Sequence, residues 1–239
     1  MKTCIYDTKP AVTSHLVQIT FLNKFSKLLY IITFMANIQI DCSIYTIQIG
    51  KHMASGKRDH LVDTALDIFC QEGFHATGID KILDKAGVAR MTLYNHFKSK
   101  DELILAALRR RDEIFRNWFM RAVERRASKP QDRLLAIFDA LEEWFTEKDF
   151  AGCIFINASA EFAEPDDPIH MAASEHKMLV LKYFRELTFA ADIADHETLA
   201  NELVLLAEGA IIMAYVAGDR NVATKAKSAA RKLIQAAVR

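Results

Sequence analysis

Residues 73–103 read GFHATGIDKILDKAGVARMTLYNHFKSKDEL, and this stretch decides the fold. Apolar residues recur in it at mostly helical spacing on both sides of a glycine: Ile79, Ile82, Leu83, Leu93 and Phe97. That spacing predicts two short amphipathic helices. Gly87 stands between them and tolerates the left-handed backbone of a tight turn. The stretch therefore predicts a helix-turn-helix over about residues 77–97.

The flanks of this stretch predict how its helices begin and end. An amphipathic helix is expected over about 57–72, with Gly73 as its stop signal. Thr77 with Asp80 three residues later resembles a capping box for the first short helix. The second short helix is expected over 90–97.

The second short helix has the composition of a helix that reads DNA. Its apolar residues point inward and its hydrogen-bonding residues point outward, which suits a helix lying in the major groove. Arginine pairs with guanine, methionine and threonine methyl groups touch thymine, and tyrosine, histidine, lysine and helix N-terminal amides hold phosphates. Short amphipathic helices around a glycine turn also occur in helical cores. The candidate DNA contacts are Thr77, Gly78, Arg90, Met91, Thr92, Tyr94, His96 and Lys100.

The literal string resembles the N-terminal domain of the tetracycline-repressor (TetR) family. The resemblance covers about residues 57–105 and is carried by GFHAT at 73–77, AGV at 86–88 and TLYNHFKSKDEL at 92–103. It implies a three-helix DNA-binding head that works as a symmetric homodimer on a palindromic operator. Gly78 departs from the serine or threonine frequent in the family, and Met91 from a smaller residue. With Gly78, a phosphate contact at this position would be made by the backbone alone. With Met91, the base preference is expected to differ from that of other family members.

The rest of the chain predicts an all-α fold with a helical ligand-binding and dimerisation domain over 104–239, behind a head at 53–103. Only eight glycines and four prolines occur, too few for a many-stranded sheet. Further helices are expected over about 101–126, 131–147, 153–162, 168–190, 196–217 and 222–238. The last two mix small and apolar residues. By the resemblance they form the dimer interface, and the alternative is a pair packed within one chain.

An unidentified small-molecule ligand is expected in the second domain. Its candidate contacts are Trp118, Phe138, Trp144, Phe155, Asn157, Glu161, Phe162, His176, Tyr183 and Met213. For the apolar residues among them, the alternative role is hydrophobic core. Cys153 is a candidate redox or electrophile sensor, and the alternative is an inert buried thiol.

Residues 1–52 differ from the rest of the chain. They are rich in Ile, Thr, Tyr and Asn, and their apolar run at 28–36 is too short to span a bilayer. Lys24 and Lys27 precede that run and leave a signal peptide open. Met53 begins a segment that looks like a natural N-terminus. We therefore expect residues 1–52 to be an atypical extension, disordered or outside the native protein.

Composition excludes several classes of protein. The formal net charge is zero, so a DNA-binding surface must be a local patch. No catalytic Ser/His/Asp set, phosphate-binding glycine loop or paired carboxylates stand out, and His170 and His176 have the wrong spacing for a helical metal pair. The sequence therefore predicts a cytoplasmic repressor released from its operator by a ligand, without enzymatic activity, cofactor, metal or membrane. The alternatives are a redox sensor at Cys153, an activator or an architectural DNA binder.

Overall fold

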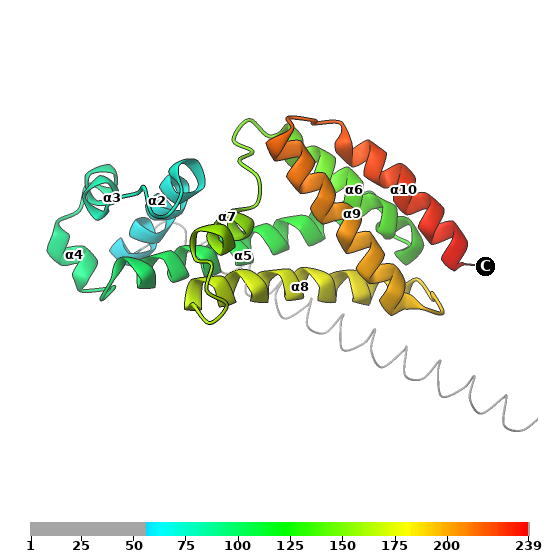
Figure 1. Cartoon of the computed structure of the whole chain (residues 1–239), viewed down its shortest axis with the longest axis horizontal. Coiled ribbons are helices and arrows are strands. Elements are labelled where there is room, and N and C mark those ends of the chain that lie inside the picture. The colour runs from blue at the N-terminus through cyan, green and yellow to red at the C-terminus, as the bar shows by residue number, and fades with distance from the viewer. Residues whose placement is uncertain (1–55, 239) are drawn as a thin grey trace, which may run out of the picture. The chain divides into compact units, whose positions relative to one another are not determined.

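A computed structural model describes residues 56–238, and every regular element in that range is an α-helix. The expected all-α class is therefore confirmed. The expectation for residues 1–52 lies outside the described residues. Figure 1 shows a group of short helices at one end and a bundle of longer helices at the other.

Three helices form the head: α2 (Lys57–Glu72), α3 (Ile79–Ala86) and α4 (Arg90–Tyr94). Gly87 adopts the left-handed conformation between α3 and α4, with φ 65° and ψ 32°. The prediction that the last of these helices extends to Phe97 is wrong. The amide of His96 bonds to the carbonyl of Leu93, three residues back, so the chain tightens and the regular helix ends.

The expected capping box before α3 is also wrong. Gly78 is the N-cap, and no side chain caps the helix. The hydroxyl of Thr77 donates instead to the carbonyl oxygen of Gly73, 2.7 Å away, and Thr77 is fully buried. Thr77 therefore closes the turn between α2 and α3.

Helix α5 (Lys100–Arg126) joins the head to the bundle (Figure 1). Ser99 caps it by accepting the amide of Glu102 at 3.2 Å, and the Glu102 carboxylate accepts the amide of Lys98 at 2.7 Å. Helix α2 packs on α5, and Arg110 on α5 donates to Asp63 on α2 at 3.1 Å. The head is thus held against the first half of α5.

The bundle contains α6 (Pro130–Thr146), α7 (Ile154–Glu161), α8 (Pro168–Ala190), α9 (His196–Val216) and α10 (Val222–Ala237). These bounds agree with the predicted helices to within one residue. Proline is the first residue of both α6 and α8, where its missing N–H costs no helical hydrogen bond. Helix α9 packs on α8 and α10, and α10 also packs on α6.

Helix α9 is apolar on more than one side. Its small residues Ala200, Ala207 and Ala214 are buried in the bundle. Within residues 56–238 it is the one helix long and apolar enough to cross a membrane, although core helices of soluble proteins meet the same criterion. Its outward side also exposes apolar side chains: Leu205, Ile212, Met213, Tyr215 and Val216.

Candidate nucleic-acid interface and ligand pocket

The outer face of α4 presents the side chains expected for DNA contact. Met91 is 71% exposed, and Arg90, Tyr94 and His96 are also exposed. Thr92 is half-buried at the side of the helix. Leu93 is fully buried beneath them and anchors the helix to the head. The burial of Leu93 and the exposure of Arg90, Met91 and Tyr94 are therefore as predicted from the spacing, whereas Thr92, predicted to point outward, is half-buried.

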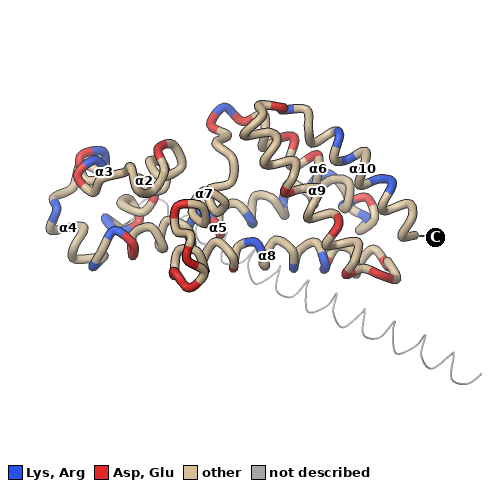
Figure 2. The backbone as a smooth tube through the Cα atoms, viewed as in Figure 1, with Lys and Arg blue, Asp and Glu red and all other residues tan. Residues whose placement is uncertain are grey.

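Arg90 has a partner within the head. Its guanidinium forms an ion pair with Asp80 of α3, and both side chains are more than half exposed. Lys81 on α3 is paired with Glu72 on α2. Figure 2 shows acidic and basic residues interspersed over the head. DNA must therefore compete with Asp80 for Arg90. Any positive charge that contacts phosphate is confined to a small part of the head surface.

Two of the remaining candidates stay accessible, and one does not. Gly78 is exposed, and nothing lies within 4 Å of the position that a Cβ would take there. Lys100 is half-buried, with its Nζ 3.5 Å from the carbonyl oxygen of His75. Thr77 is a correction to the predicted set, because a fully buried residue with a committed hydroxyl cannot reach a phosphate.

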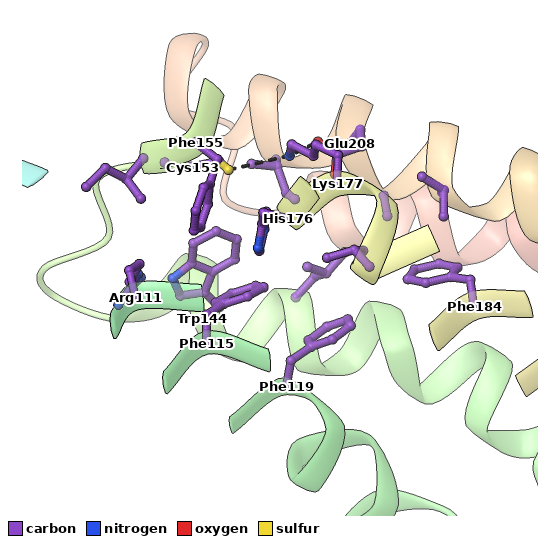
Figure 3. Close-up of a pocket in the computed structure, with 17 residues that line it drawn as sticks. Arg111, Phe115, Phe119, Trp144, Cys153, Phe155, His176, Lys177, Phe184 and Glu208 are labelled. Carbon is purple, nitrogen blue, oxygen red and sulfur yellow. Dashed lines mark hydrogen bonds and ion pairs between the residues drawn. The ribbon is translucent and has the colours of Figure 1, made fainter. Parts of the chain in front are cut away.

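A pocket with a free volume of about 30 Å³ lies inside the bundle (Figure 3). Helices α5 to α9 and the loop before α7 all contribute to its wall. Three predicted ligand contacts line it: Trp144, Phe155 and His176. The ring of His176 stacks on that of Phe155 with centroids 3.7 Å apart. The wall is mostly apolar and aromatic, as in pockets for small organic molecules.

The other predicted ligand residues do not line this pocket. Phe138 is core, at 1% exposed. Trp118 and Asn157 are half-buried outside its wall, and Met213 is 47% exposed on α9. Tyr183 lines a separate hollow between α5 and α8. Helical periodicity shows that these residues are apolar or face inward, but not which inward residues meet at one place.

Glu161 and Phe162 bind the head instead of a ligand. The Glu161 carboxylate accepts the amide of Phe74 at 2.9 Å and the amide of His75 at 2.6 Å, and the ring Nδ1 of His75 lies 2.9 Å away. Phe162 stacks on the His75 ring at 4.7 Å. Gly73 allows this approach, because a Cβ there would lie 2.8 Å from the carboxylate. We call this contact the α7 latch.

The electrostatics of the latch favour an ionised carboxylate. Burial acts to raise the pKa of Glu161. The hydrogen bonds from the His75 and Phe74 amides and from the His75 ring outweigh burial and hold that pKa below its usual value. The carboxylate therefore ties the end of α7 to the turn that precedes α3.

His176 is fixed in the pocket by a carboxylate. Its Nδ1 lies 2.7 Å from Asp112 Oδ1, and Arg116 donates to both oxygens of the same group. Burial acts to raise the pKa of Asp112, but the hydrogen bonds from His176 and Arg116 lower it to about 2. Burial lowers the pKa of His176, although Asp112 opposes that shift. At neutral pH the pair is therefore a carboxylate and a neutral imidazole.

Four residues of the pocket wall were not predicted from the sequence: Arg111, Phe115, Lys177 and Glu208. Three of them are charged, and Phe115 lies beside Arg111. Lys177 Nζ lies 2.6 Å from Glu208 Oε2 and 3.4 Å from the sulfur of Cys153. Cys153 itself is a buried free thiol in the pocket wall. A charged residue on a helix looks like a solvated residue in sequence, so only the packing of α5, α8 and α9 shows that these line a cavity.

Among residues 56–238, no group of three His, Cys, Asp or Glu side chains comes together to hold a metal ion. His170 binds the carbonyl of Phe162 at 2.8 Å, and His176 binds Asp112. These two histidines therefore serve the protein's own hydrogen bonds.

A head with an exposed recognition helix, joined to a bundle with an internal pocket, defines a helix-turn-helix transcriptional regulator. The family description "Bacterial regulatory proteins, tetR family" matches residues 61–107. The description "Tetracyclin repressor-like, C-terminal domain" matches residues 130–230. A solved TetR-family regulator from Streptomyces coelicolor is 31% identical, with a TM-score of 0.70 over 77% of this chain and 96% of its own.

Two curated relatives match shorter parts of the chain. The transcriptional activator FasR of Mycolicibacterium smegmatis is 36% identical over 109 residues, which are 46% of this chain and 49% of FasR. The transcriptional repressor NemR of Escherichia coli is 25% identical over 124 residues, which are 52% of this chain and 62% of NemR. The matches thus span about half to two thirds of these relatives. The chain belongs to the TetR family, and it is a transcriptional regulator rather than an enzyme.

Proposed function

We propose that the chain is a cytoplasmic, homodimeric repressor that leaves a palindromic operator when a small molecule enters the pocket. One observation carries the proposal: a single short helix connects the pocket to the head. Phe155, near the start of α7, lines the pocket, and Glu161, at its end, forms the latch to the head. A ligand that moves Phe155 therefore acts on a helix that is bonded to the DNA-binding domain.

The DNA-binding part of the proposal rests on α4 and its flanks. Arg90, Met91 and Thr92 are assigned to base edges in the major groove. Tyr94, His96 and Lys100 are assigned to phosphates, together with the backbone at Gly78. Asp80 orients Arg90 before DNA arrives. Phosphate contacts would position the head, and the base contacts would select the operator.

The release step is a shift between two conformations of the dimer. The latch holds the turn at Phe74 and His75, one short loop before α3. A ligand lowers DNA affinity only if it binds more tightly to a conformation whose heads do not fit the operator than to the DNA-binding conformation. Displacement of α7 by the ligand, transmitted through Glu161, supplies that difference in binding free energy.

The dimer would form through the exposed face of α9, with α10 beside it. Leu205, Gly209, Ile212 and Val216 recur at intervals of four, three and four residues, so they share one face of the helix. Leu205 is 73% and Val216 74% exposed in the single chain. An apolar stripe of this kind is suited to a second copy of the same helix, and a palindrome requires two heads.

The first experiment is fluorescence anisotropy of the full chain on DNA from upstream of its own gene, against random DNA across a salt series. Preferential binding that weakens steeply with salt supports the proposal. A library of small molecules is then screened for release. Equal binding to both DNAs would contradict operator recognition at that site, and selection of bound fragments from the whole genome would show whether any operator exists. Operator binding that increases with ligand would favour an activator, as FasR is named.

The redox alternative at Cys153 has one observation in its favour, the Lys177 ammonium beside the sulfur. The sulfur is however in the wall of the ligand pocket and only 8% exposed, so it is shielded from oxidants. We expect Cys153→Ser to keep the operator affinity and its response to hydrogen peroxide unchanged. Loss of a peroxide response in this variant alone, measured by the same anisotropy assay, would restore the thiol sensor.

A further inference from the structure

We infer that the pocket takes a flat aromatic molecule that carries a carboxylate and a hydrogen-bond donor such as a phenolic hydroxyl. The inference rests on the proposed function, because it names the class of ligand for the same pocket. Three features of the wall carry it: its flat rings, the free nitrogen of His176 and the charge of Arg111 (Figure 3).

The rings give the pocket flat walls. His176 and Phe155 are stacked almost parallel, at 8° and 3.7 Å between centroids. Phe115 lies 4.8 Å from Trp144 and stacks on Phe119 at 5.7 Å and 10°. In Figure 3 the rings of Phe155, His176, Trp144 and Phe115 lie close together in the pocket wall. Aromatic rings attract one another in stacked and edge-to-face geometries, so such a wall favours a planar aromatic ligand over a branched aliphatic one.

His176 offers this space a hydrogen-bond acceptor. Its Nδ1 is held by the ionised carboxylate of Asp112, and a carboxylate only accepts, so the ring proton is on Nδ1. The Nε2 lone pair is therefore free to accept, since within residues 56–238 the hydrogen bond of this ring is the one between Nδ1 and Asp112. The residue is 3% exposed. A ligand hydroxyl or N–H that enters the pocket can therefore donate to Nε2.

Arg111 offers a cation that the described part of the chain does not neutralise. Its neighbours on α5 are paired, Arg110 with Asp63 and Arg116 with Asp112, and Lys177 is paired with Glu208. Arg111 forms no ion pair among residues 56–238. Its charge reaches Glu147 in the loop beside the pocket, but the two groups are not in ion-pair contact. A ligand carboxylate would therefore find a guanidinium with its hydrogen-bond donors available.

One ligand can reach both polar groups along the ring of Phe115. The guanidinium carbon of Arg111 lies 5.9 Å from the centroid of that ring, and the ring of His176 lies 6.0 Å from it. A two-ring aromatic molecule that displaces neighbouring side chains to lie against Phe115 would thus have a polar group near each end. The acid end faces Arg111 and the donor end faces His176.

The test is isothermal titration calorimetry of the full chain with three probes. The first is a hydroxynaphthoate with hydroxyl and carboxylate at opposite ends, the second its methyl ether and the third its carboxamide. We expect the hydroxy acid to bind about tenfold tighter than either analogue, since each analogue lacks one polar contact. This comparison needs no substitution, so it does not depend on whether a variant folds.

Two variants assign the contacts. Arg111→Gln should abolish the preference for acid over amide and keep the preference for hydroxyl over ether. His176→Phe, which keeps a flat ring, should have the converse effect. Arg109→Gln is the matched control, because Arg109 is exposed on the same helix as Arg111 but outside the pocket wall and should leave both preferences in place. A thermal melt of each variant confirms that it is folded.

The inference is overturned if none of the probes binds, or if the three bind with equal affinity. The proposed function fails separately. A chain that prefers the hydroxy acid but does not prefer any operator over random DNA keeps its ligand class and loses its assigned role. A chain that binds an operator and ignores the difference between the probes keeps its role and loses this ligand class.

Discussion

The head and the ligand domain place their functional side chains in opposite ways. In the head, α4 turns Leu93 into the core and leaves Arg90 and Met91 on the surface. In the ligand domain, helices α5 to α9 turn functional side chains such as His176 inward around a pocket. The head therefore presents its candidate residues on a convex surface, and the bundle arranges its own around an internal pocket. The α7 latch connects the head to the bundle.

The largest expected effect tests whether the two heads depend on the bundle for their spacing. Ile212→Arg places a charge on the apolar face of α9, where it would oppose its own copy across the dimer axis. We expect a monomer by analytical ultracentrifugation and a loss of operator affinity on the order of 100-fold, because the second head loses its tethering. Ser174→Arg, exposed on α8 and away from α9 and α10, is the control. A monomeric variant with full operator affinity would refute the dimer.

The second prediction separates the roles within the head. Arg90→Ala should cost about 1–3 kcal/mol on the operator and little on random DNA, if Arg90 reads a base. Lys100→Ala should weaken both DNAs alike and reduce the salt dependence, because a phosphate contact carries no sequence information. Anisotropy titrations at several salt concentrations give both quantities. An equal loss on operator and random DNA for Arg90→Ala would contradict its assigned role.

The third prediction tests the connection between the two domains. Glu161→Gln keeps the size of the side chain but removes the charge that the Phe74 and His75 amides bind. We expect ligand binding in the pocket to be retained while the effect of the ligand on operator affinity falls about fivefold, the lower range of allosteric coupling. Glu164→Gln is an exposed control just beyond α7. An unchanged coupling would place the transmission elsewhere, with α5 as the next candidate.

The smallest expected effect concerns pH. Since the pKa of Asp112 is lowered from 3.8 to about 2 in the folded chain, its carboxylate stabilises the fold fully above its unfolded pKa. This stabilisation is lost as the pH falls through the folded pKa. Urea midpoints between about pH 5 and pH 2 should therefore decrease less for Asp112→Asn than for the natural chain. Parallel curves for the two proteins would show that Asp112 is not specially stabilised.

The head was predictable from sequence because its function is local. One continuous stretch contains the turn glycine at Gly87, the apolar anchors and the residues on the opposite face of a short helix. Helical spacing alone separates those faces. The two exceptions are Thr77 and the end of α4. Each depends on which backbone carbonyl accepts a hydrogen bond from a hydroxyl or an amide. That choice depends on three-dimensional neighbours and not on spacing.

The sequence by itself determined the class of protein and the helices and their order. Only the tertiary structure decided which inward residues share a cavity, because the wall combines helices distant in the chain. Trp144, Phe155 and His176 line the cavity, whereas Phe138 lies in the core and Met213 is exposed. The helical pattern in the sequence does not distinguish these two groups. The tertiary structure also places Glu161 in the latch and not in the ligand pocket. Its carboxylate accepts from backbone N–H groups that are close in space but lie 86 and 87 residues earlier in the chain.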